Sequence, residues 1–242
     1  MDMVKIGTYV LARNEELLMP YILRHYKQYG DVIILESNST DRTVEIATAG
    51  GATVYQYDTK DEVNDSVFIQ IKESCWKNSK ADWVIVVDAD EFVYHPDLIG
   101  ILERTDSTVI HPKYWNMFTE TFPTTSGQIY EEVNMGTDKG VSAIWGTKTL
   151  MFKPSEIKRM NWDPGCHGCN PEGNVRIEYN SGIMTLHMRF LSRQHLIERY
   201  TSEAKRMSIL NIYKGWGTQF FWSAKQINKI FDETMPTLKR II

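Results

Sequence analysis

The chain has 242 residues, of which 42% are hydrophobic and 24% are charged, so a packed globular core is expected. Its 27 basic and 31 acidic residues give a net charge of −4, which excludes a strong overall attraction to nucleic acid or anionic lipid. Three cysteines do not form a disulfide scaffold, and Cys166 and Cys169 lack the second ligand pair of a structural zinc site. With neither a membrane-spanning apolar run nor a recognisable signal peptide, the sequence predicts a cytoplasmic protein.

Short apolar runs alternate with segments of helical periodicity over roughly the first 110 residues. Asn14 is predicted to cap the first helix, and Gly30 is predicted to end it. The order of strand and helix, with short connections, is typical of a doubly wound, mostly parallel α/β sheet. Predicted strands cover residues 4–11, 32–35, 53–57, 83–87 and 108–111, with helices at about 18–29, 41–49, 64–76 and 96–102.

The pattern changes after about residue 112. Residues 119–135 are polar and lack a helical period, residues 141–152 favour a strand, and residues 162–171 are dense in turn formers. A strand is predicted at 183–188, and the chain is predicted to be helical from Ser192 onwards. The predicted organisation is an α/β domain over residues 1–190, with halves 1–110 and 111–190, followed by a C-terminal helical region over 191–242.

The sequence DWVIVVDADEF at residues 82–92 combines a buried-strand pattern with an acidic end. Ligands of open α/β sheets bind beyond the carboxyl ends of the strands, where Asp88, Asp90 and Glu91 would lie. Acidic residues at this point fit either the first turn of a helix or a divalent cation site built from carboxylate oxygens. The sequence by itself leaves both interpretations open.

Polar turns after the first, second and fourth predicted strands fall on the same edge of a parallel sheet. They carry Arg13 and Asn14, then residues 36–42, then residues 88–91. A basic residue, hydrogen-bonding side chains and a carboxylate pair on one edge indicate a site for an anionic ligand bridged by a metal. The sequence has neither GxGxxG nor GxxxxGK[ST], so a dinucleotide or P-loop site is not supported.

Three stretches, TYVLARNEELLMPYILRHY, VIILESNSTDRTVEIA and DWVIVVDADEFVY, occur in this order within residues 3–100. Together they resemble the nucleotide-sugar half of family 2 glycosyltransferases with the GT-A fold. The resemblance implies a nucleotide-diphosphate sugar donor, expected to be a UDP-sugar, and a divalent cation, Mn²⁺ or Mg²⁺, on the DxD motif. It also implies transfer of the sugar to an acceptor, with inversion at the anomeric carbon.

The same resemblance assigns roles to individual residues of this chain. Asp88 would approach the ribose or the metal, Asp90 would bind the metal that bridges the diphosphate, and Glu36 would contact the base. Arg42 matches the family pattern STDxT, although capping and surface solvation also explain it. The further residues expected around the donor are Leu11, Arg13, Asn14, Glu15, Asn38 and Ala89.

A metal held by Asp88 and Asp90 needs a further ligand, and His187 is the candidate because it lies near the end of a predicted strand. Its alternative role is that of a hydrogen-bonded core histidine. An inverting transferase also needs a base that takes the proton of the acceptor. Asp163, His167 and Glu172 lie in the turn-rich segment, and the candidates taken from it are Asp163 and His167. Asp163 also fits a simple turn residue, and His167 is followed by Gly168 where relatives often carry an acidic partner.

Two C-terminal features have several interpretations. A basic stretch is interpreted as a solvated helix face rather than a nucleic-acid site, because the net charge is acidic. The aromatic segment 219–231 is expected to pack on the protein's own core or to form a homo-oligomer contact, with membrane association as the alternative. The basic stretch consists of Arg189, Arg193, Arg199, Lys205 and Arg206.

Two other functions compete with the glycosyltransferase hypothesis. A nucleotidyltransferase also places carboxylates and metal at strand ends, but it would carry a glycine-rich basic loop where this chain has LARNEE. A non-catalytic module for nucleotide or carbohydrate binding is the second alternative. The acceptor is not specified by the sequence: a growing glycan, a lipid-linked sugar, a protein side chain and a modified nucleobase all remain open.

Overall fold

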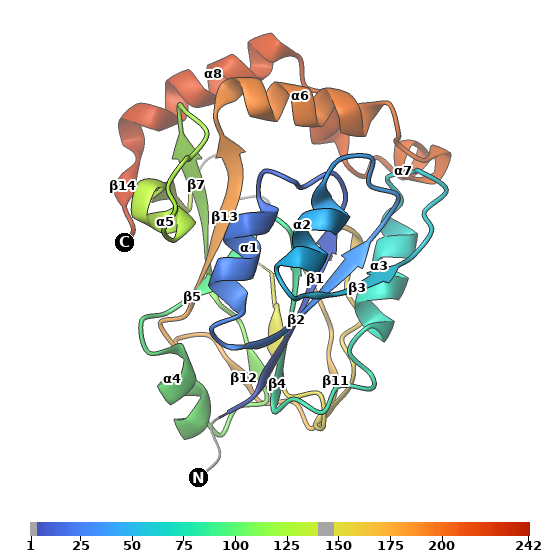
Figure 1. Ribbon diagram of the computed structural model, residues 1–242, viewed down its shortest axis with the longest axis vertical. Coiled ribbons are helices and arrows are strands. Elements are labelled where there is room, and N and C mark those ends of the chain that lie inside the picture. The colour runs from blue at the N-terminus through green and yellow to red at the C-terminus, as the bar shows by residue number, and fades with distance from the viewer. Residues whose placement is uncertain (1–3, 140–147) are drawn as a thin grey trace.

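The chain folds into an α/β structure built on two sheets (Figure 1), and the computed structural model describes residues 4–139 and 148–242. The larger sheet has the strand order β12-β6-β9-β4-β1-β2-β3. In this sheet only β9 runs antiparallel to its neighbours among the described residues, so the predicted mostly parallel α/β architecture is confirmed. Its strands are β1 (Ile6–Ala12), β2 (Gly30–Glu36), β3 (Thr53–Gln56), β4 (Trp83–Asp88), β6 (Val109–Ile110), β9 (Met151–Phe152) and β12 (Ile177–Glu178).

Strand β4 shows why the apolar run at its centre forms a strand buried on both faces. Its side chains alternate between two hydrophobic cores, because successive residues of a strand point to opposite faces. Ile85 and Val87 belong to the core that includes α1 (Met19–Tyr26) and α2 (Thr43–Ala49). Val84 and Val86 belong to the core on which α3 (Asp65–Ser74) packs through Phe68 and Ile71. With both faces covered, polar side chains are left to the strand ends.

The second sheet joins the middle of the chain to its end, in the order β14-β8-β7-β13-β5. Strands β5 and β7 were not predicted, because no local alternation marks them and their pairing partner β13 lies far along the chain. The predicted strand at 141–152 is described only from residue 148 onwards. The strands are β5 (Glu91–Tyr94), β7 (Lys113–Thr119), β8 (Met135–Thr137), β13 (Met184–Leu191) and β14 (Lys239–Arg240), with the small pair β10 (Ile157–Arg159) and β11 (Glu172–Gly173) apart from them.

The chain after Ser192 is mainly helical, as predicted. Helix α6 (Arg193–Ala204) runs across the end of the molecule toward which β1 and β3 point (Figure 1), and α7 (Ile209–Lys214) and α8 (Ala224–Thr234) follow it. Ile227 and Phe231 of α8 are fully buried and pack with Phe118 and Phe190, so the aromatic segment does contribute to the protein's own core. The remaining short helices are α4 (Leu98–Arg104), α5 (Ile129–Glu132), η2 (Pro164–Cys166), η3 (Thr218–Phe221) and η4 (Met235–Thr237).

Two predicted helix boundaries were wrong. Asn14 does not cap the first helix: α1 begins at Met19, and Asn14 lies in a turn with a φ of 52° and accepts a hydrogen bond from the backbone N–H of Thr40 at 2.7 Å. Gly30 does not follow a helix directly but opens β2. By contrast, the helix predicted to begin at about residue 64 does begin there: of the two candidate caps, Asn64 and Asp65, it is Asn64 that caps α3, since its side chain accepts a hydrogen bond from the N–H of Val67.

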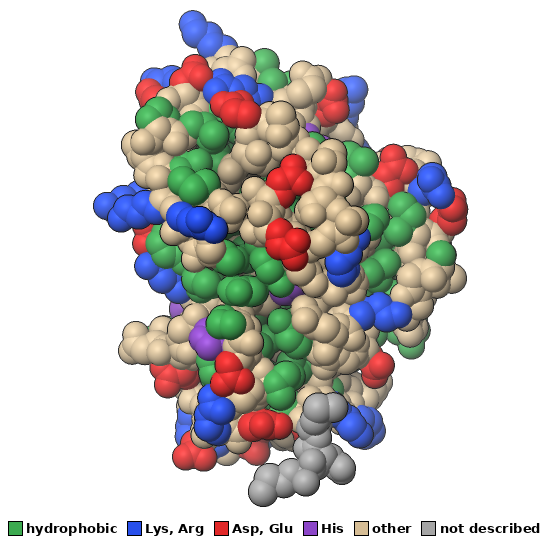
Figure 2. All heavy atoms as spheres, turned by 60° about the vertical axis from the view of Figure 1, so that its left-hand side comes forward, with side chains coloured by type: hydrophobic (Ala, Val, Ile, Leu, Met, Phe, Trp, Pro, Cys, Tyr) green, Lys and Arg blue, Asp and Glu red, His purple; other side chains and the backbone are tan. Residues whose placement is uncertain are grey.

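The surface carries charges of both signs, as the similar numbers of acidic and basic residues lead one to expect. Acidic and basic side chains are interspersed over the face shown in Figure 2, and hydrophobic side chains form a band at mid-height. Within the described ranges, no helix has the length and apolar character needed to cross a membrane.

Gly30 occupies a position that a larger residue cannot fill, and this leads to a test of the fold. Its φ is 150°, and a Cβ added there would lie 2.2 Å from the backbone oxygen of Ile6 on β1. We expect Gly30→Ala to lower the free energy of unfolding by about 1–3 kcal/mol, measured by chemical denaturation.

Gly7→Ala is the matched control for Gly30→Ala. Gly7 also lies in the parallel sheet, but a Cβ there would make ordinary contacts, the nearest at 3.4 Å from the hydroxyl of Ser79. Equal losses of stability in the two variants would contradict a specific steric conflict at Gly30.

Candidate functional site

A cavity of about 370 Å³ lies where β1 and β4 end, between α3 and the C-terminal segments. This position is where open α/β sheets bind ligands. The lining includes aromatic side chains, among them Tyr57, Tyr200 and Trp216, and more basic than acidic residues. The basic residues are Arg13, Lys72, Lys148, Arg189, Arg199 and Arg206, and the acidic ones are Glu15, Asp65, Asp88 and Glu203.

Asp88, the last residue of β4, lies between two buried lysines. Lys72 of α3 approaches one carboxylate oxygen, Nζ to Oδ1, at 2.7 Å, and Lys148 approaches the other, Nζ to Oδ2, at 2.7 Å. The ammonium of Lys148 also lies 2.7 Å from Oε1 of Glu91. Glu91 in turn accepts hydrogen bonds from the N–H of Asp88 at 2.9 Å and from the hydroxyl of Tyr114 at 2.9 Å. Glu91 therefore orients Asp88 and does not cap a helix.

Charge pairing keeps these groups ionised although they are buried. Burial alone lowers the pKa of Lys72, but the nearby carboxylate of Asp88 outweighs this effect and raises the pKa above its usual value. The same balance raises the pKa of Lys148. Burial would raise the pKa of Asp88, but Lys148 and Lys72 hold it well below its usual range. At neutral pH both lysines are therefore ammonium groups and Asp88 is a carboxylate.

Asp90 belongs to a second cluster of buried charges. Its Oδ2 lies 2.8 Å from Nε of Arg189, 3.5 Å from Nε2 of His187 and 3.7 Å from Nη2 of Arg199. Burial would raise the pKa of Asp90, but Arg189, His187 and Arg199 hold it well below its usual value. Both carboxylate oxygens lack a hydrogen-bond partner within the described part of the chain, so the contact with Arg189 acts through charge rather than through an aligned hydrogen bond.

Glu15, which follows β1, connects this second cluster to the N-terminal half. Its Oε1 lies 2.7 Å from Nη2 of Arg199. Burial raises the pKa of Glu15 to about 7 against the opposing effect of Arg199, so its charge changes close to neutral pH. The end of β1 is therefore attached to α6 by an ion pair between residues 184 positions apart.

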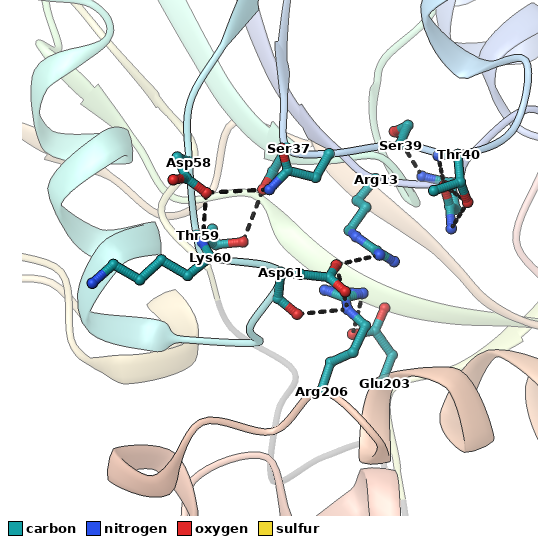
Figure 3. A network of polar contacts seen from close by, with 12 residues as sticks. Arg13, Ser37, Ser39, Thr40, Asp58, Thr59, Lys60, Asp61, Glu203 and Arg206 are labelled. Carbon is teal, nitrogen blue, oxygen red and sulfur yellow. Dashed lines mark hydrogen bonds and ion pairs between the residues drawn. The ribbon is translucent and has the colours of Figure 1, made fainter.

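Arg13 and Arg206 converge on Asp61 at the wall of the cavity (Figure 3). Arg13 forms an ion pair with Asp61, and Nε of Arg206 lies 3.3 Å from Oδ1 of the same carboxylate. Arg13 directly follows β1, whereas Arg206 follows α6. The shared contact with Asp61 therefore connects segments that are distant in the sequence. Two guanidinium groups share one exposed carboxylate here, which favours the binding of an anion.

The structure brings about half of the predicted site residues to the cavity and leaves the others outside it. Those outside have other contacts: Glu36 is buried and accepts from the N–H of Ser39, Asn38 donates to Asp58 at 3.2 Å, and Arg42 pairs on the surface with Glu45. Their predicted roles in donor binding stay predictions. The predicted residues that line the cavity are Leu11, Arg13, Glu15, Asp88, Ala89, His167 and His187, and those that do not are Asn14, Glu36, Asn38, Arg42, Asp90 and Asp163.

The two predicted base candidates differ in position. His167 lines the cavity next to η2, whereas Asp163 is exposed and is not among the lining residues. His167 is therefore the better placed of the two candidates, although its role stays a prediction.

The predicted metal ligand His187 has a neutral imidazole at pH 7, because burial lowers its pKa against the effect of Asp90. Its Nδ1 lies 2.7 Å from Oδ1 of Asn116.

The predicted metal ligands Asp88, Asp90 and His187 do not form a ligand set. Both oxygens of Asp88 are paired with lysine ammonium groups, and Asp90 is surrounded by two guanidinium groups. A divalent cation at either carboxylate would lie beside side chains of like charge. Over the described ranges, no three His, Cys, Asp or Glu side chains are arranged to hold a metal ion. The donor set does not fit a divalent cation in this arrangement.

Sequence reasoning missed several basic residues of the cavity. Lys72 and Lys148 were not singled out, and the basic stretch near the C-terminus was interpreted as a solvated helix face. That interpretation is wrong for Arg189, which lies on strand β13, and for Arg199 and Arg206, since all three line the cavity. The seven-residue spacing of Arg199 and Arg206 would place them on one face of a continuous helix, but α6 ends at Ala204, and such spacing does not indicate what the two side chains contact.

The buried charge of Asp90 leads to a prediction about stability. Asp90→Asn leaves Arg189 without its buried counter-charge, so we expect the free energy of unfolding to fall by about 3 kcal/mol. The double variant Asp90→Asn/Arg189→Met should recover much of this loss in chemical denaturation.

Asp97→Asn is the control, because Asp97 pairs with Arg104 at 2.8 Å on the surface, where both side chains are mostly exposed. The control should stay close to the wild-type stability. If Asp90→Asn were no more destabilising than Asp97→Asn, the structural role of the Asp90 pair would be refuted.

No protein-family model matches the chain. A TPR repeat-containing protein of Synechococcus elongatus is 32% identical over 90 residues, which are 37% of this chain and 21% of that protein. An uncharacterized glycosyltransferase of Rickettsia typhi is 37% identical over 90 residues, 37% of this chain and 29% of that protein. The chain therefore spans less than a third of the length of these relatives.

Among solved structures, the chain is similar to glucosyl-3-phosphoglycerate synthase from Mycobacterium tuberculosis in complex with Mg²⁺ and UDP. The match has a TM-score of 0.34 and 22% identity, and it covers 44% of this chain and 42% of that one. Over 88 to 90 of its residues, the chain is similar in sequence to three proteins named glycosyltransferases.

Proposed function

We propose that this chain is the donor-binding and catalytic part of a glycosyltransferase that moves a sugar from a nucleotide diphosphate to an acceptor. The observation that carries the proposal is the cavity at the carboxyl ends of β1 and β4, where basic side chains meet aromatic ones. Basic groups fit the diphosphate, and aromatic faces fit a base or a sugar. The sequence relationship to glycosyltransferases supports the same conclusion.

The contacts of the cavity suggest how the donor lies. Arg13, which shares Asp61 with Arg206, is available to a phosphate group at one wall. Lys72 and Lys148 lie at the end of β4, next to Asp88. The donor is proposed to be a UDP-sugar transferred with inversion, and His167 is proposed to take the proton of the acceptor. The acceptor itself is left open.

A nucleotidyltransferase remains the weaker candidate. That reaction calls for a glycine-rich basic loop after the first strand. Here the turn after β1 carries Glu15, whose carboxylate is paired with Arg199, and it contains no glycine. The structure offers no specific observation in favour of nucleotidyl transfer.

A thermal-shift screen with UDP-sugars and GDP-sugars, each with Mn²⁺ and with EDTA, tests the proposal. We expect at least one nucleotide sugar to raise the melting temperature, because a ligand that binds only the folded state stabilises it. The same donor should be hydrolysed slowly when water replaces the acceptor. Absence of stabilisation by every donor would refute the donor-binding function, whereas stabilisation without hydrolysis would indicate a non-catalytic binding module.

Arg13 and Arg42 provide a matched pair of variants. Arg13 lines the cavity, whereas Arg42 is exposed and pairs with Glu45 at 2.7 Å on the surface. We expect Arg13→Met to weaken binding of the nucleotide sugar by about tenfold, the loss of one charge-assisted hydrogen bond, and Arg42→Met to leave it almost unchanged. Titration calorimetry measures the affinity of both variants. A larger loss in Arg42→Met than in Arg13→Met would indicate that the donor binds near Arg42 and not in the cavity.

A further inference from the structure

The paired lysines at Asp88 are unusual because both ammonium groups are almost fully buried. The side chains of Lys72 and Lys148 are only 3% and 6% exposed, whereas that of Asp88 is 30% exposed. Removing an ammonium group from water costs several kcal/mol, even after structural relaxation. One lysine would suffice to neutralise Asp88, so the second buried charge is not required for pairing with Asp88 alone.

The charge of this cluster equals that of a metal site. Two ammonium groups rest on the carboxylates of Asp88 and Glu91, just as one divalent cation would rest on two carboxylates. Each ammonium also has three N–H donors. Within the described residues, Lys72 donates to Asp88 and Lys148 to Asp88 and Glu91, which leaves donors on both groups for a ligand oxygen.

The two lysines also lie at the place in the fold where a metal site would be expected. Lys72, Lys148 and Asp88 all line the cavity, at the strand end where a cation would be expected. Asp90, the second carboxylate of the DxD motif, is fully buried and does not line the cavity. Its counter-charges are Arg189 and Arg199, and the imidazole of His187 lies beside it. The motif therefore holds basic side chains in place on both of its aspartates.

We propose that Lys72 and Lys148 replace the divalent cation in this chain and bind the diphosphate of the donor directly. This inference rests on the proposed glycosyltransferase function. In the transfer, the acceptor oxygen forms a bond to the anomeric carbon, and the bond from that carbon to the diphosphate oxygen breaks. The electron pair stays on the diphosphate, where the two ammonium groups stabilise it, and the acceptor's proton passes to the base.

Binding of UDP and GDP to the full chain tests the replacement without relying on activity. The expected result in titration calorimetry is that one of them binds after EDTA treatment within about twofold of its affinity in Mn²⁺, since no metal-bound contact is lost. Binding that appears only with Mn²⁺ would overturn the inference and leave the proposed function intact. Absence of binding in both conditions would instead contradict the proposed function itself.

Variants of the two lysines give the second test. Lys72→Met and Lys148→Met should each weaken binding of the nucleoside diphosphate by about tenfold or more, because each removes a charge-assisted contact with the diphosphate. Lys148→Arg keeps the charge and should retain most of the affinity. Lys229→Met is the control, since Lys229 is 72% exposed on α8 and pairs with Glu233.

Two further measurements separate loss of the contact from loss of the fold. Uridine and guanosine lack the diphosphate, so the methionine variants should bind the matching nucleoside as the wild type does. If either methionine variant fails to fold by circular dichroism, Lys148→Arg and the EDTA experiment decide. Methionine variants that fold and bind the diphosphate as tightly as the wild type would overturn the inference.

Discussion

Buried ion pairs around Asp88 and Asp90 connect the structural elements that meet at the cavity. Asp88 is paired with Lys72 of α3, and Asp90 with Arg189 of β13. Glu15, after β1, is paired with Arg199 of α6. Because an unpaired buried charge costs several kcal/mol, each of these elements must stay in register with the others. The cavity is a consequence of this constraint, since its walls come from both ends of the chain.

The parallel sheet explains why all the chemistry gathers at one place. Side chains along β1 and β4 are covered on both faces by hydrophobic cores. Polar groups can therefore appear only where the strands end, and parallel strands end at the same edge. Helix α6 then closes that edge (Figure 1) and adds Arg199 to it. An anionic ligand that enters the cavity thus meets basic groups from elements that are distant in sequence.

Features that depend on neighbouring residues in the chain were predicted correctly, whereas features that depend on contacts between distant segments were missed. Strands β1 to β4 and helices α1 to α3 were predicted because apolar periodicity and caps such as Asn64 are local signals. Strands β5 and β7 were missed because they are defined by pairing with β13. In the site, Arg13 and Asp88 were predicted from their places after strands, whereas Lys72 was missed because nothing in its helix indicates that it reaches Asp88.

The sequence by itself determined the α/β class, the edge of the sheet at which the cavity lies, and the similarity to glycosyltransferases. These follow from strand order and from local motifs, which do not depend on distant contacts. Only the tertiary structure decided what the two aspartates of the motif contact. Whether a carboxylate binds a metal or pairs with a basic side chain depends on the charges around it. Here those charges belong to Lys72, Lys148 and Arg189, which come from parts of the chain distant from one another.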